Sequence, residues 1–276
     1  EKDKLVRGLE ELGFTRKNLA LFRDILSKSR GIVLVTGPTG AGKTTTLYSA
    51  LAFLGGREKN ILTVEDPVEY EIPAIRQTQV KPKAGFTFAT AIRSLLRQDP
   101  DVIMIGEIRD PETAQLALRA ALSGVLVFST LHTQDSAGAI PRLMDMGLEP
   151  YLLASGILAV VTQRLLRVIC PDCREATSYP LETLVKAGLP ADADLVLYRG
   201  RGCERCAGTG YRGRTGAFEI LAIDPSIHDL IRKRADSRLL KDAAVKAGMK
   251  TLLDDALSKA LFGQTTLEEV LRVAYE

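Results

Sequence analysis

The stretch that decides the fold is GIVLVTGPTGAGKT, which occupies residues 31–44. Its first six residues are largely apolar and β-branched, as is typical of a parallel strand buried on both faces. The next eight fit the pattern GxxxxGK[ST] in full, and a helical pattern then runs to about Leu54. Strand, glycine-rich loop and helix in this order predict a phosphate-binding loop. The alternative is a glycine-rich turn without a ligand, but such a turn would not need a buried strand before it and a helix after it.

Such a loop binds a nucleotide because its backbone N–H groups and the positive end of the following helix face the phosphates. Lys43 would reach the β- and γ-phosphates, and the Thr44 hydroxyl would bind Mg²⁺. The residues expected to contact the nucleotide from this loop are Gly37, Pro38, Thr39, Gly40, Ala41, Gly42, Lys43, Thr44 and Thr45.

Strand and helix patterns alternate through residue 146, which predicts an α/β fold with crossover connections and a mostly parallel sheet. Thr87 and Asp110 are expected to cap two of the helices. Between residues 69 and 85 the alternation lapses, and 72–80 could form a small antiparallel excursion. The expected strands are 61–65, 102–106 and 125–130, and the expected helices are 88–98, 112–122 and 137–146.

Two acidic segments, VEDPVEY and VIMIGEIRD, end or follow predicted strands. Open α/β sheets form their binding sites at the carboxyl ends of the strands. Glu65 and Glu107 come directly after buried apolar strands. Because nucleotide hydrolysis needs a carboxylate that organises metal or water, we expect both glutamates in the site.

Other polar residues near these strand ends are less specific signals. Glu69 and Asp110 are interpreted mainly as surface residues that cap helices or pair with arginines. His132, in STLHT just past the strand 125–130, is expected near the phosphates, although a lone histidine is more often structural. His228 is interpreted as structural.

Composition limits the classes of function. The chain has 276 residues, a net charge of +3, 5% aromatic residues and no Trp, which argues against a nucleic-acid partner. Its longest apolar run, 152–161, is well short of the roughly 20 residues of a membrane span, so we expect no direct span. The sequence starts at Glu1 without a signal peptide, and we expect a piece of a longer, non-exported protein.

All four cysteines lie in two CxxC pairs separated by a glycine-rich segment with little periodicity. Two such pairs can bring four thiolates to one structural Zn²⁺. Their separation exceeds that of a zinc ribbon and leaves room for a loop. Four unrelated reduced thiols, or a redox pair, are the alternatives. The expected zinc ligands are Cys170, Cys173, Cys203 and Cys206.

These features divide the chain into four parts. We expect a helical lead-in at 1–30, the α/β nucleotide-binding core at 31–169, a tetracysteine insertion at 170–215 and a helical C-terminal cap at 216–276.

The boxes GPTGAGKTTTLY, VEDPVEY, LLRQDPDVIMIGEIRD, STLHT, CPDC and CERC, in this order, resemble the secretion ATPase superfamily. Within it they are similar to the type II secretion and type IV pilus assembly branch. The resemblance implies a RecA-like core in a homo-hexameric ring that hydrolyses Mg-ATP. It also implies a cytoplasmic location, peripheral to the inner membrane through a platform protein.

The resemblance assigns roles to residues in these boxes. It links Glu107 and Glu65 to water activation and metal organisation, and we favour Glu107 for the water. It places His132 at the γ-phosphate. The catalytic set it implies is Glu107, Glu65, His132 and Lys43. The arginines it suggests for charge stabilisation at subunit boundaries are Arg93, Arg97 and Arg214.

The sequence also departs from the pattern of its relatives. Val125 stands where a histidine is common, and Gln134 stands where an asparagine is common. Relatives carry an N-terminal domain that closes over the nucleotide, and this chain begins after it, so we expect weak hydrolysis in isolation.

Within the branch, the four cysteines favour pilus extension or secretion, because retraction ATPases lack this element. The function expected is therefore a motor for pilus assembly or type II secretion. A nucleic-acid translocase and a nucleotide switch without turnover are the alternatives. Low charge argues against the first, and the presence of both Glu65 and Glu107 argues against the second.

Overall fold

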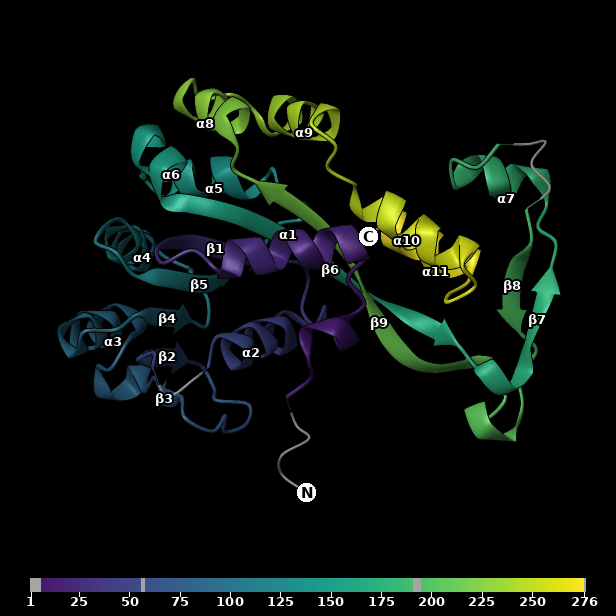
Figure 1. The fold of residues 1–276 in the computed structure, drawn as a ribbon, viewed down its shortest axis with the longest axis horizontal. Coiled ribbons are helices and arrows are strands. Elements are labelled where there is room, and N and C mark those ends of the chain that lie inside the picture. Colours follow the sequence, from purple (N-terminus) through teal and green to yellow (C-terminus); the bar gives the residue numbers. More distant parts are fainter. Residues whose placement is uncertain (1–5, 56–57, 191–194, 276) are drawn as a thin grey trace.

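A seven-stranded, mostly parallel sheet organises the chain (Figure 1). The computed structural model describes residues 6–55, 58–190 and 195–275. The strand order is β3-β2-β4-β5-β1-β6-β9, with β9 antiparallel to β6, and the predicted α/β class is confirmed. The strands of this sheet are β1 (Gly31–Thr36), β2 (Ile61–Glu65), β3 (Arg76–Gln79), β4 (Val102–Ile105), β5 (Leu126–Leu131), β6 (Ile157–Ile169) and β9 (Tyr211–Ala222).

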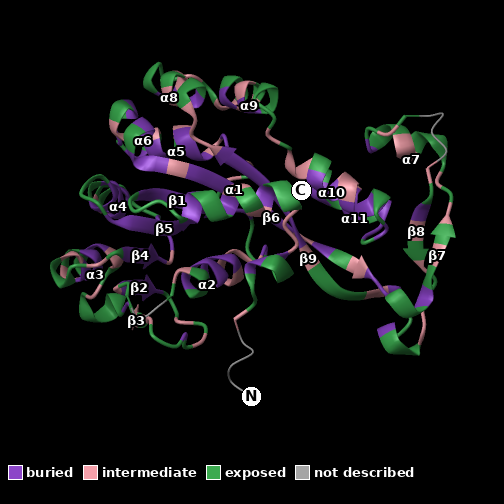
Figure 2. Ribbon diagram, viewed as in Figure 1, coloured by how far each residue is buried: buried purple, intermediate pink, exposed green. Residues whose placement is uncertain are grey.

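Helices cover both faces of the sheet because successive side chains of β1 point to opposite faces. Ile32 and Leu34 pack with α3, α4 and α6, whereas Val33 and Val35 pack with α1 and α2. The central strands are therefore buried throughout (Figure 2). The helices around the sheet are α1 (Arg16–Leu26), α2 (Lys43–Leu54), α3 (Phe88–Leu95), α4 (Pro111–Leu122), α5 (Ala139–Asp145), α6 (Pro150–Gly156), α8 (Pro225–Arg232) and α9 (Ser237–Lys246).

Helix starts follow the predicted caps. The Thr87 side chain accepts a hydrogen bond from the Thr90 backbone N–H at the start of α3. The Asp110 side chain accepts one from the Thr113 backbone N–H at the start of α4. Both caps satisfy amide groups that a helix cannot pair internally. They also fix the chain segments that lead from β3 into α3 and from β4 into α4.

An arm leaves the sheet where β6 and β9 continue as an antiparallel ribbon (Figure 1). At its end lie β7 (Arg174–Thr177), α7 (Leu181–Lys186) and β8 (Leu197–Gly200), and β7 pairs antiparallel with β8. A third apolar cluster joins this region to α10 (Leu252–Leu261) and α11 (Leu267–Tyr275). The expected boundary between residues 215 and 216 falls inside β9.

One expectation for the sheet was wrong. The segment 72–80 was expected to form an antiparallel excursion, but β3 pairs parallel with β2. Ile72 is buried in the apolar cluster beneath α2, which anchors the chain on one face before it returns to the sheet edge. The chain therefore re-enters the sheet in the same direction as β2.

Within the described ranges, none of the helices has both the length and the apolar character needed to cross a membrane.

Candidate active site and metal centre

The phosphate loop joins β1 to α2 and curls back on itself at its glycines. Gly37, Gly40 and Gly42 have φ angles of 144°, 81° and 86°, which other residues rarely adopt. A Cβ atom on Gly37 would lie 2.5 Å from the carbonyl oxygen of Gln163, so β6 packs closely against the loop. The first turn of α2 begins at Lys43, directly after this curl.

Lys43 lies back along the loop. Its Nζ donates hydrogen bonds to the carbonyl oxygens of Gly37 at 2.8 Å and Pro38 at 3.0 Å. Burial lowers the pKa of Lys43, an effect that Glu107 opposes and Arg164 reinforces. A triphosphate placed here would add negative charge and so favour the protonated lysine.

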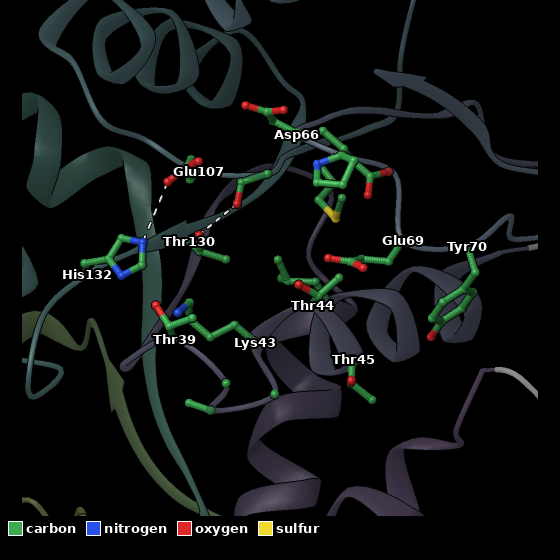
Figure 3. Close-up of a pocket in the computed structure, with 18 of the residues that line it drawn as sticks. Thr39, Lys43, Thr44, Thr45, Asp66, Glu69, Tyr70, Glu107, Thr130 and His132 are labelled. Carbon is green, nitrogen blue, oxygen red and sulfur yellow. Dashed lines mark hydrogen bonds and ion pairs between the residues drawn. The ribbon is translucent and has the colours of Figure 1, made fainter. Parts of the chain in front are cut away.

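Glu107 and His132 face each other across the ends of β4 and β5 (Figure 3). The two strand ends are joined by a hydrogen bond from Thr130 Oγ1 to the Gly106 carbonyl oxygen, at 2.8 Å. The Glu107 side chain is 11% exposed, and its Oε2 lies 3.7 Å from His132 Nε2 and 2.5 Å from Arg109 Nε. A nearly buried carboxylate therefore meets an imidazole and a guanidinium at the predicted position.

Glu65 is held differently from Glu107. Its side chain accepts hydrogen bonds from the Tyr48 hydroxyl, from Thr63 Oγ1 at 2.5 Å and from Gln77 Nε2 at 3.2 Å. The residue is 2% exposed. Burial, reinforced by the Glu65 carboxylate, raises the pKa of Tyr48, so the phenol remains a donor. Glu65 thus forms part of the wall, with its oxygens engaged by protein donors.

A cavity of about 610 Å³ brings most of the predicted residues together. Glu69 and Asp66, which follow β2 and are exposed, also line it (Figure 3). Gly37 and Pro38 belong to the loop but do not line the cavity. The predicted residues that line the cavity are Thr39, Gly40, Ala41, Gly42, Lys43, Thr44, Thr45, Glu65, Glu107, His132 and Arg214.

Two of the predicted arginines are not part of this lining. Arg93 forms an ion pair with Glu112 between α3 and α4. Arg97 donates a hydrogen bond to Ser94 Oγ at 3.4 Å. Their predicted role at a subunit boundary stays a prediction.

A polar pair on β6 lies beside the loop and was not predicted from the sequence. Arg164 is 5% exposed and donates to the carbonyl oxygens of Gln163 and Gln134, each at 3.2 Å. Gln163 Oε1 accepts from Thr46 Oγ1 at 2.7 Å. The available signal was a Gln-Arg pair inside an otherwise apolar run, but only the pairing of β6 with β1 places it at the loop.

The four cysteines meet at the far end of the arm. All four Sγ atoms lie within 4.8 Å of one another, and Cys170, Cys173 and Cys206 are buried. The Sγ–Sγ distances are 3.9 Å for Cys170–Cys203, 3.9 Å for Cys173–Cys206 and 3.7 Å for Cys203–Cys206. The sequence prediction that the two pairs converge is confirmed.

These distances fit a tetrahedral four-thiolate metal site. Metal–sulfur bonds of about 2.3 Å in a tetrahedron place the sulfurs about 3.8 Å apart. Backbone N–H groups of Cys203 and Gly210 point at Cys206 Sγ, each at 3.2 Å, as suits a sulfur that carries negative charge. The donor set is that of a structural zinc site, since four thiolates leave no open position.

The profile of the family described as type II/IV secretion system protein matches residues 1–272. The chain belongs to this family. It is 48% identical over 276 residues to the type II secretion system protein E of Aeromonas hydrophila, covering 100% of this chain and 55% of that protein. It is 50% identical over 266 residues to the type IV pilus assembly ATPase PilB of Thermus thermophilus, covering 95% of this chain and 30% of that protein. The chain therefore spans about half, or less, of the length of these relatives.

Solved structures show the same fold. The pilus retraction motor PilT with bound ADP matches with a TM-score of 0.73 and 28% identity, over 99% of this chain and 68% of that one. The ATPase DotB of Legionella pneumophila matches with a TM-score of 0.70 and 24% identity, over 98% and 66%. At that identity the DotB match shows the fold alone.

Proposed function

We propose that this chain is the ATP-hydrolysing part of a homo-hexameric motor that powers type IV pilus assembly or type II secretion. The position of Glu107 carries the proposal, because a nearly buried carboxylate shares one cavity with the phosphate loop and His132. Membership of the family supports it, since the relatives include an ATPase for pilus assembly.

Each side chain has a defined task in this proposal. The loop N–H groups and Lys43 bind the β- and γ-phosphates. Thr44 would hold Mg²⁺, which neutralises charge that develops on the phosphates. Glu107 orients the attacking water and accepts its proton, and His132 contacts the γ-phosphate. Glu65, engaged by three donors, shapes the wall on the metal side.

The chain's relatives favour extension or secretion over retraction. Identity is 48–50% to secretion and assembly proteins, compared with 28% to the retraction motor. We infer that the motor works in the cytoplasm against a platform protein of the inner membrane. Arg93, Arg97 and Arg214 would act at subunit boundaries, and the four cysteines would hold a structural Zn²⁺.

The test is ATP hydrolysis against protein concentration for the wild type and Glu107→Gln. Sites completed between subunits make specific activity rise with concentration. The variant should retain ATP binding while kcat falls about 10²–10⁴-fold, as loss of a general base predicts. Glu182→Gln, which changes an exposed glutamate on α7, is the control and should match the wild type.

Two results would contradict parts of the proposal. Unchanged hydrolysis in Glu107→Gln would remove this residue from catalysis. ATP binding without hydrolysis by the wild type, at every concentration, would favour the nucleotide switch.

A further inference from the structure

A further buried carboxylate, Glu219, lies outside the lining of the candidate site. Glu219, on β9, pairs with Thr162 of β6 across the sheet, and its side chain is 1% exposed. Burying a charge is costly unless it is paired and hydrogen-bonded, so the contacts of Glu219 report what it holds in place. It helps to line a separate cavity of about 400 Å³, between the segment after His132 and the start of α10.

The two oxygens of Glu219 bind different parts of the chain. Oε1 accepts from the backbone N–H of Ser136 at 3.1 Å and from its hydroxyl at 2.5 Å. Oε2 accepts from the backbone N–H of Leu252 at 3.2 Å, at the first residue of α10, and lies 3.8 Å from Lys241 Nζ. A carboxylate at a helix N-terminus is favourable, so the second oxygen also stabilises α10.

Ser136 belongs to a compact segment that leaves His132. Within it, Asp135 accepts from the Gly138 N–H at 2.9 Å through its side chain and from Thr133 Oγ1 at 3.0 Å through its carbonyl. Lys241 Nζ lies 3.3 Å from Asp135 Oδ2 as well as near Glu219. The segment 133–138 is therefore fixed to β9 through Ser136 and to α9 through Asp135, within four residues of His132.

We propose that Glu219 is a positioning residue: by holding the segment 133–138, it keeps His132 opposite Glu107 and links that segment to the start of α10. The kinetic part rests on the proposed function. Glutamine at this position has only one acceptor oxygen, so the backbone N–H of either Ser136 or Leu252 must lose its acceptor. His132 would then sample positions away from Glu107, which slows the chemical step more than it weakens ATP binding.

A double-mutant cycle tests the kinetic part. In Glu219→Gln we expect kcat to fall about tenfold while KM for ATP changes less than about twofold. Because Glu219 acts through His132, adding the Glu219→Gln substitution to His132→Ala should slow the enzyme no further. The proposal would be overturned if the two effects on kcat were additive, or if kcat were unchanged in Glu219→Gln. It would also be overturned if Glu219→Gln slowed the enzyme while His132→Ala did not.

A matched control separates positioning from general destabilisation. Glu269→Gln changes another carboxylate that is 1% exposed, on α11, where it binds Arg167 and Arg272. It should lower the melting temperature without coupling to His132→Ala. Ser136→Ala, which removes only the hydroxyl contact, provides a milder variant should Glu219→Gln fold poorly, and it should lower kcat in the same direction.

Hydrogen exchange provides a readout that does not need hydrolysis. Amide protection of residues 133–138 and of the first turn of α10 should fall together in Glu219→Gln, and stay unchanged in Glu269→Gln. This result would support the link even if the wild type failed to hydrolyse ATP, which would reject the proposed function alone. Unchanged protection in Glu219→Gln would reject the link.

Discussion

The phosphate loop and the thiol cluster are both candidate ligand sites, but they are held together in opposite ways. The loop is fixed by the sheet beneath it, since β6 packs against Gly37 and protein donors engage Glu65. The cysteines sit at the tip of an arm where little apolar surface is buried around them. Their apolar cluster consists of the four cysteines alone.

This difference separates a site that the fold creates from a site that completes the fold. Removing a nucleotide leaves strands, caps and hydrogen bonds of the first site in place. Without a metal, the second would keep four sulfurs within 4.8 Å of one another, held by backbone hydrogen bonds but by little apolar packing. The arm is therefore expected to depend on its ion far more than the sheet depends on its substrate.

The largest effect is expected from removing zinc. Zinc binding contributes about 10–16 kcal/mol to folding in small zinc modules, so chelation or Cys173→Ser should unfold much of residues 170–190 and 195–210. ATP affinity should change less than about twofold, because the phosphate loop rests on the sheet. Metal analysis of the reduced protein, hydrogen exchange and nucleotide titration would measure the three quantities.

Asp172→Asn is the control for the thiol cluster. It removes the ion pairs with Arg205 and Arg212 but keeps every sulfur, and it should retain zinc. The contrast between loop and arm would be wrong if the reduced wild type contained no zinc. It would also be wrong if loss of zinc lowered ATP affinity as much as it lowered amide protection in the arm.

A smaller effect is expected at Glu269, whose carboxylate joins α11 to Arg167 of β6 at the base of the arm without a metal. Burial alone would raise the pKa of Glu269, but hydrogen bonds from Arg272 and Arg167 lower it to about 2 from its usual 4.5. The stabilisation is therefore complete above about pH 4.5 and is lost as the pH falls towards 2. In urea unfolding between pH 6 and 3, Glu269→Gln should lose less stability than the wild type.

Acid also protonates metal-binding thiolates, and that loss is common to both proteins. The informative quantity is therefore the difference in unfolding free energy between wild type and variant. It should shrink as the pH falls. A difference that stays constant over this range would show that the two arginines do not depend on the charge of Glu269.

Local patterns in the sequence indicated the elements that surround the first cavity, but not the residues that support it. The strand before the phosphate loop, the loop and α2 were readable because their signals lie within 24 consecutive residues of sequence, 31–54. Glu107 and His132 share one cavity because parallel strands end at one edge of the sheet, and their catalytic roles stay predictions. Arg164 was missed because its position at the loop depends on the pairing of β6 with β1. Glu219 was missed because its position depends on β9 returning beside β6, about 50 residues later in the chain.

The thiol cluster could be predicted from the sequence because each CxxC pair is a local signal, like the phosphate loop. The direction of β3 was not, because it depends on how Ile72 anchors the preceding segment. Local sequence thus predicts which groups carry chemistry, and tertiary packing decides which groups hold them.

The smallest effect tests whether hydrogen bonds alone hold the wall of the first site. Tyr48→Phe removes one donor to Glu65 and the acceptor of the Glu69 N–H, at 3.3 Å. Because Thr63 and Gln77 still donate to Glu65, we expect a loss of only about 1–2 kcal/mol in unfolding free energy. For kcat we expect a loss of less than about tenfold, far below that of Glu107→Gln. Tyr151→Phe, at an exposed position, is the control and should change neither quantity. A loss of kcat in Tyr48→Phe as large as in Glu107→Gln would show that Glu65 is more than a wall residue and takes part in the chemical step.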